Sequence, residues 1–155
     1  LRKKNIQPLG GKPLIAWSIE AALGCRLVDR VLVSTDSQEF ANIAKGHGAD
    51  APFLRPKQIS GDAAKVEEAL THAIGWVERH ENEHYDIVVL LQTTDVFRNK
   101  NIIEEVIISL LEDPSLDTAF AAKPEYKNYW TMTDLVNFLY PSDFFIKNFC
   151  LLSFF

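Results

Sequence analysis

The apolar run at residues 86–92 constrains the fold of this 155-residue chain more than any other feature. It reads Asp-Ile-Val-Val-Leu-Leu-Gln, so consecutive aliphatic residues stand where a half-exposed strand would alternate apolar and polar side chains. Continuous runs of this kind are typical of parallel strands that are covered on both faces. The run therefore predicts a buried parallel strand, and with it a protein that combines strands and helices.

Strand and helix patterns alternate along the rest of the chain. Further strands are predicted at residues 30–34, 51–54 and 118–122. Helices are predicted at residues 13–23, 36–47, 63–79 and 101–111. This alternation predicts an α/β fold with a Rossmann-like, mostly parallel sheet and helices on both of its faces.

Particular residues mark where these helices begin and which face they bury. Asp36 is predicted to cap the second helix, although a carboxylate at that place is also a candidate metal ligand. Asp62 is predicted to cap the long third helix. On the fourth, Ile102, Val106 and Leu110 recur at helical spacing and are predicted to form the buried stripe.

Composition narrows the class of protein. The formal net charge is −5, which argues against the broad basic face of a nucleic-acid-binding protein. Cys25 and Cys150 lie in no Cys-x-x-Cys pair, which favours a reduced, cytoplasmic compartment. No apolar run has the length of a membrane span, so no membrane partner is expected. The chain begins with Leu1 rather than Met, and we expect it to be cut short.

The last stretch of the chain differs from the rest. Six of the ten phenylalanines lie between residues 138 and 155, in a segment without clear periodicity. We predict a partial α/β domain over residues 1–130 and a divergent or truncated aromatic tail over residues 131–155. The tail is either a strand and helix separated from their packing partners or sequence that no longer follows the parent fold.

Polar side chains directly after the predicted strands are the first candidates for a binding site, because α/β sheets bind ligands beyond the carboxyl ends of their strands. The amide of Gln92 can read the edge of a base or hydrogen-bond its own loop. The guanidinium of Arg55 can grip a phosphate or carboxylate, or lie solvated on the surface. Arg98 has the same two readings, and a third in which it ties down its own loop.

Lys4 and Asn5 belong to a polar cluster before the glycine turn at residues 10–11. This cluster could bind a polyanion, or it could simply be solvated. The four histidines show no convergent spacing, and no Ser-His-Asp or Cys-His set can be argued. The sequence therefore identifies no catalytic residue and no metal ligand set. It also lacks the glycine-rich motifs of classical dinucleotide and P-loop sites.

Four motifs in a fixed order resemble those of the acylneuraminate cytidylyltransferase family. They are Lys-Asn-Ile followed by Leu-Gly-Gly-Lys-Pro-Leu at residues 4–14, Val-Ser-Thr-Asp at 33–36, Phe-Leu-Arg-Pro at 53–56 and Leu-Leu-Gln-Thr-Thr-Asp-Val-Phe-Arg at 90–98. The similarity covers roughly residues 1–130. It implies the nucleotide-diphospho-sugar transferase type of fold, of which the first strand is missing in this chain.

The resemblance also implies a reaction. The anomeric hydroxyl of an acidic, sialic acid-like nine-carbon sugar attacks the α-phosphate of CTP, usually with Mg²⁺, and CMP-sugar and pyrophosphate result. The positions of Asn5, Arg55 and Gln92 contact the nucleotide in the family, with Gln92 at the cytosine, and Lys4 matches a basic residue near the phosphates. Arg98 remains a possible substrate or loop contact. Full-length relatives are expected to be homodimers.

Departures from the family pattern keep other functions open. Residues 62–66 read Asp-Ala-Ala-Lys-Val where the family has Asp-Thr-Ala-Ser-Ser, and Thr93 and Asp95 replace a Pro and a Ser. Only the end of the family's basic phosphate loop remains, and its metal-binding aspartates lie beyond the matching region, where Asp134 and Asp143 do not reproduce their context. The dimerisation segment of the family is also absent. The alternatives are an inactive relic that at most binds nucleotide, and another sugar-nucleotide pyrophosphorylase.

Overall fold

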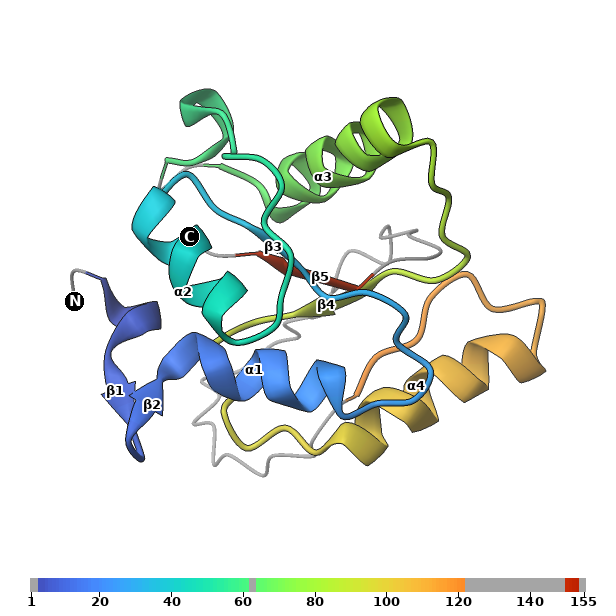
Figure 1. Ribbon diagram of the computed structural model, residues 1–155. Helices are drawn as coiled ribbons and strands as arrows, with labels where there is room; N and C mark the ends of the chain where they lie inside the picture. The colour runs from blue at the N-terminus through green and yellow to red at the C-terminus, as the bar shows by residue number, and fades with distance from the viewer. Residues whose placement is uncertain (1–2, 62–63, 122–149, 154–155) are drawn as a thin grey trace, which may run out of the picture.

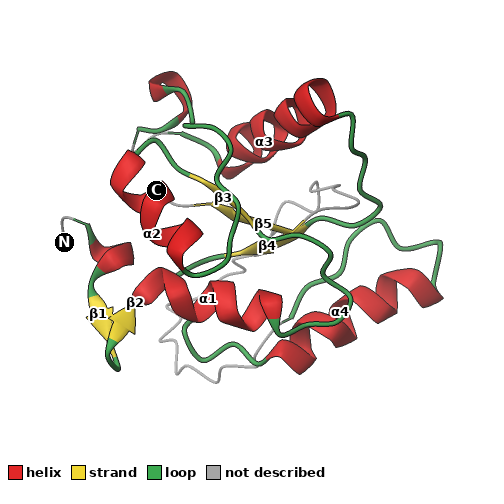
Figure 2. Cartoon of the chain, in the orientation of Figure 1, coloured by secondary structure: helices red, strands yellow, loops and turns green. Residues whose placement is uncertain are grey.

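The computed structural model describes residues 3–61, 64–121 and 150–153 of the chain. Within them, helices surround a small central sheet, and the fold is α/β as predicted (Figures 1 and 2). The α-helices are α1 (Leu14–Leu23), α2 (Gln38–Gly46), α3 (Val66–Glu81) and α4 (Lys100–Glu112). Over the described residues, no helix is long and apolar enough to cross a membrane.

The central sheet has three strands in the order β3 (Leu32–Ser34), β5 (Cys150–Ser153) and β4 (Val89–Leu91). Both pairings are parallel, and Leu151 is in register with Leu32 on one side and with Leu90 on the other. β3 and β4 therefore meet only through β5 (Figure 1). The middle strand comes from the segment predicted to be the aromatic tail, and both readings of that tail stay predictions.

The two faces of the sheet bury different helices. Val31 and Val33 point to one side of β3 and Leu32 to the other, as the two-residue period of a strand requires. The first side packs on buried residues of α1, α2 and α4, among them Ile19 and Ile107. The second packs on α3, through buried residues Leu70, Ala73 and Val77. Figure 1 shows α3 alone on one side of the strands and α1 with α4 on the other.

A short hairpin precedes α1 and is fixed to it. β1 (Pro8–Leu9) pairs with β2 (Lys12–Pro13) across Gly10 and Gly11, whose φ angles of 59° and 87° are both positive. Positive φ at both central positions is what a tight two-residue hairpin turn requires, and glycine adopts it without strain. The indole nitrogen of Trp17 donates to the Leu9 carbonyl over 3.0 Å, so the hairpin is held against the start of α1.

Three local predictions about helices were wrong. Ser37, not Asp36, caps α2: its Oγ accepts from the backbone N–H of Phe40 over 3.4 Å. The long helix α3 begins at Val66 instead of residue 63, after Lys65, whose N–H donates to Glu68. The predicted cap Asp62 lies outside the described residues. On α4 the buried residues are Ile103 and Ile107, whereas Ile102 is 41% exposed, so the stripe is shifted by one position.

The strand predictions hold at residues 30–34 and 86–92 and fail at the other two candidates. Residues 51–54 form no strand; just before them, Asp50 makes an isolated parallel bridge with Leu32 of β3. Residues 118–121 are not in a strand either, and residue 122 lies outside the described part. β4 is shorter than predicted and not buried on both faces, because Leu90 is 38% exposed.

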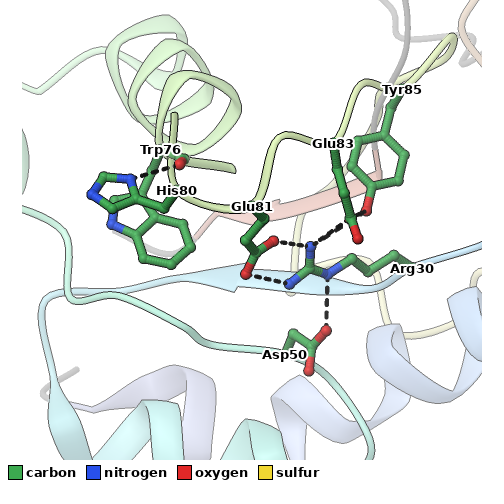
Figure 3. A network of polar contacts seen from close by, with 7 residues as sticks. All are labelled: Arg30, Asp50, Trp76, His80, Glu81, Glu83 and Tyr85. Carbon is green, nitrogen blue, oxygen red and sulfur yellow. Dashed lines mark hydrogen bonds and ion pairs between the residues drawn. The ribbon is translucent and has the colours of Figure 1, made fainter. Parts of the chain in front are cut away.

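Arg30 fastens the start of β3 to the end of α3. Its guanidinium contacts Glu81 at 2.5 Å, Asp50 at 2.8 Å and Glu83 at 3.1 Å, and the Tyr85 hydroxyl lies 3.3 Å away. Figure 3 shows these groups converging on the guanidinium, with Trp76 and His80 stacked beside them. The hydrogen bond from Arg30 lowers the pKa of Glu81, so the pair stays ionised well below neutral pH. This cluster fixes how α3 lies across the sheet, at the end opposite the predicted ligand edge.

Candidate functional site

The carboxyl ends of β3 and β4 lie at the same edge of the sheet, because both strands run parallel to β5. Beyond β3 stands the buried Thr35, and beyond β4 stand Gln92 and Thr93. This is the edge at which α/β sheets present side chains to ligands. The residues at this edge are therefore the first candidates for a ligand site.

A cavity of about 130 Å³ opens at this edge, next to β4. Lys4 and Asn5 come to it from the turn of 3-10 helix at Lys4–Ile6. Asn5 lies 88 residues away in sequence from Thr93, whose side chain it contacts. Val66 reaches it from the first turn of α3. Its lining is completed by four residues around the end of β4, namely Leu90, Gln92, Thr93 and Thr94. Three of the residues predicted from sequence, Lys4, Asn5 and Gln92, are thus brought together.

The polar side chains of this cavity differ in how far they are buried and hydrogen-bonded. Asn5 and Thr93 are each 4% exposed, and the Thr93 hydroxyl donates to Oδ1 of Asn5 over 3.1 Å. Lys4 and Gln92 are exposed. The cavity therefore has a fixed polar floor and two flexible side chains at its rim, one cationic and one amide.

Arg55 lies at the end of β3, outside the lining of this cavity. Its backbone N–H donates to the Thr35 carbonyl over 2.8 Å, and its Nε donates to the Ser60 hydroxyl over 3.1 Å. The side chain is 3% exposed, so it is not the solvated surface arginine of the alternative reading. Burial lowers its pKa while the nearby carboxylate of Asp36 opposes that change, and the guanidinium remains charged at neutral pH.

Arg98 folds back on the loop that follows β4. Its Nη2 lies 3.4 Å from the Gln92 carbonyl and 3.3 Å from the Asp95 carboxylate. This is the loop-tying geometry among its three readings. Nη1 of the same guanidinium is buried and has no hydrogen-bond partner among the described residues.

Several further residues were assigned no binding role from the sequence. Thr93 is the most informative: it directly follows Gln92, so the strand-end rule points to it, but no local signal shows that it meets Asn5. Ser34 ends β3 with a buried hydroxyl that has no partner among the described residues. His72 on α3 contacts the Phe53 ring at 4.9 Å; burial first, then the charges of Arg79 and Arg55, lower its pKa, so it is neutral at pH 7.

A larger cavity, of about 210 Å³, lies at the opposite ends of the strands. Its lining is mainly aliphatic, and includes Val89 from β4 and Ile107 from α4. Its one cation, Arg30, is already surrounded by carboxylates. Volume alone favours this cavity, but it lies away from the carboxyl ends of the strands, where α/β sheets bind ligands, so the smaller cavity is the better candidate site.

The described residues do not form a metal centre. No group of three histidine, cysteine, aspartate or glutamate side chains gathers anywhere within them. Of the two carboxylates at the candidate edge, Asp36 stands near Arg55 and Asp95 is paired with Arg98. Mg²⁺ therefore stays a prediction for this chain.

Comparison with known proteins places this chain in a family. Residues 1–136 match the family model described as cytidylyltransferase. Pseudaminic acid cytidylyltransferase of Campylobacter jejuni is 37% identical over 124 residues, which are 80% of this chain and 53% of the relative. N-acylneuraminate cytidylyltransferase of Escherichia coli is 38% identical over 107 residues, 69% of this chain and 24% of the relative. The chain thus spans about half the length of the Campylobacter relative and about a quarter of the Escherichia relative.

A solved structure agrees with the fold. CMP:2-keto-3-deoxy-manno-octonic acid synthetase, complexed with CTP, superposes with a TM-score of 0.60 over 76% of this chain and 44% of its own, at 24% identity. At that identity the likeness supports the fold. The family match extends over most of the chain and confirms the resemblance carried by the four motifs. The chain belongs to the cytidylyltransferase family.

Proposed function

We propose that this chain carries the nucleotide site of an enzyme that transfers CMP from CTP to an acidic nine-carbon sugar and releases pyrophosphate. The observation that carries the proposal is the meeting of Lys4, Asn5 and Gln92 around one cavity at the carboxyl edge of the sheet. They come from two motifs far apart in the sequence, and both motifs are among the four shared with the family. The relatives are named for the same transfer, to pseudaminic and N-acylneuraminic acid.

The side chains are suited to hold CTP in place. The exposed amide of Gln92 offers donors and an acceptor to the edge of cytosine. Lys4 supplies a flexible positive charge, and the buried guanidinium of Arg55 a fixed one, for the phosphates. Displacement at a phosphate needs alignment and neutralisation of charge more than covalent help from the protein. These residues are binding residues, and we assign no general base.

The finer fold and the partners are also proposals. We propose that the intact sheet is the Rossmann-like, mostly parallel sheet of nucleotide-diphospho-sugar transferases, with β3, β5 and β4 as its described part. The parallel pairings and the helices on both faces support this. Homodimerisation and a requirement for Mg²⁺ are proposed from the resemblance alone.

Replacing Gln92 with alanine tests the site. We expect Gln92→Ala to weaken CTP binding about tenfold and to bring the affinities for CTP and UTP closer together, since the variant loses hydrogen bonds to the base. Because Gln92 is exposed, the thermal midpoint of unfolding should stay unchanged. Calorimetric titration of the 155-residue chain with both nucleotides measures the effect.

Gln38→Ala is the matched control, because Gln38 is equally exposed but its amide donates to Asn42 within α2. It should bind CTP as the unmodified chain does. Full CTP affinity in Gln92→Ala would remove the base-reading role from this residue.

A further inference from the structure

The buried hydrogen bond between Thr93 and Asn5 joins the two halves of the candidate site. Thr93 follows β4, whereas Asn5 belongs to the 3-10 turn before the hairpin. Both side chains line the cavity and both are 4% exposed. The only hydrogen bond of the Asn5 side chain to a described residue is the one it accepts from the Thr93 hydroxyl, at 3.1 Å.

This bond decides which part of the Asn5 amide faces a ligand. A carboxamide has an acceptor oxygen and a donor nitrogen, and it can turn to present either. In this structure Oδ1 accepts from the Thr93 hydroxyl, and Nδ2 makes no hydrogen bond to a described residue, so the amide nitrogen is the donor available to a ligand. A donor suits the acceptor oxygens of a nucleotide, whether on a phosphate, the ribose or the pyrimidine ring. A turned amide would bring its oxygen to those same oxygens and repel them.

We infer that Thr93 is a positioning residue for nucleotide binding, which holds Asn5 with its amide nitrogen toward the ligand. The inference rests on the proposed function. Thr93 does not need to touch the nucleotide for this role, since it acts through Asn5. A residue of the same shape without a hydroxyl would leave the Asn5 amide free to turn. Ligand binding would then have to order that amide, which lowers the affinity.

A double-mutant cycle in the full 155-residue chain tests the role. Thr93→Val removes the hydroxyl but keeps the shape, and we expect it to weaken CTP binding about three- to tenfold. Thr93→Ser keeps the hydroxyl and should restore most of the affinity. In an Asn5→Ala background, Thr93→Val should cause no further loss, because the group it positions is absent. Thermal unfolding without nucleotide, measured for each variant, shows whether the fold is retained.

The outcomes separate this role from the proposed function. If the unmodified chain binds CTP and Thr93→Val binds it equally well, the positioning role is wrong and the proposed function stands. Equal losses from Thr93→Val with and without Asn5 would also overturn it, since they would show that Thr93 acts independently. If the unmodified chain binds no CTP, both fail together.

Discussion

Leu151→Pro should unfold the domain or leave it barely stable. Residue 151 is in register with Leu32 of β3 and Leu90 of β4, at the middle of the three strands. Proline removes a backbone N–H and its ring does not fit a central strand, which costs at least about 3 kcal/mol. Small domains have a total stability of only about 5–15 kcal/mol. We therefore expect the midpoint of thermal unfolding to fall by roughly 10 °C or more.

Leu151→Val is the matched control, because it keeps the backbone N–H and is a residue that strands favour. Its unfolding midpoint should stay within a few degrees of the unmodified chain, about the range of a conservative substitution. Circular dichroism during heating measures both variants. A proline variant that melts where the unmodified chain melts would mean that β5 is not the strand that joins β3 and β4, and the sheet would have to be built differently.

Arg55→Met should lower the affinity for CTP on the order of 100-fold, since a fork of two charge-assisted hydrogen bonds to phosphate is lost. The CTP affinity of Arg55→Lys should lie between those of the unmodified chain and Arg55→Met, because lysine keeps the charge but not the planar fork. The site of Arg55 favours a fixed cation: it is 3% exposed and held by Ser60 at its Nε. Calorimetric titration with CTP gives the affinities.

Arg79→Met is the control for this prediction, since Arg79 is an exposed arginine on α3. It should leave CTP affinity unchanged. If Arg55→Met binds CTP normally but unfolds at a lower temperature, Arg55 serves the structure of its loop and not the nucleotide. Normal binding would remove Arg55 from the nucleotide site and confine that site to the residues around β4.

The sequence predicted the helices and the two main strands because their signals are local. A strand is indicated by five aliphatic residues in a row, and a helix by a proline and a glycine at its two ends. Both signals depend only on residues close together in the sequence. Boundaries were less accurate for the same reason. Asp36 and Ser37 are both good helix caps, and only the actual path of the chain decides that Ser37 accepts the Phe40 N–H.

Long-range pairings could not be predicted in this way. Nothing near residues 150–153 indicates that they form the middle strand, because that depends on two open strand edges more than 50 residues away along the chain. The bond between Asn5 and Thr93 is equally hidden, since it joins residues 88 positions apart. The ordered motifs pointed to Lys4, Asn5 and Gln92, and the structure adds that they surround one cavity.

Calorimetric titration of the unmodified 155-residue chain with CTP and with UTP tests the central claim most directly. We expect saturable binding of CTP and binding of UTP weaker by about tenfold, because Gln92 and its neighbours read the edge of the base. Absence of CTP binding by the folded chain, or equal affinity for the two nucleotides, would contradict the claim that this edge of the sheet is a cytidine nucleotide site.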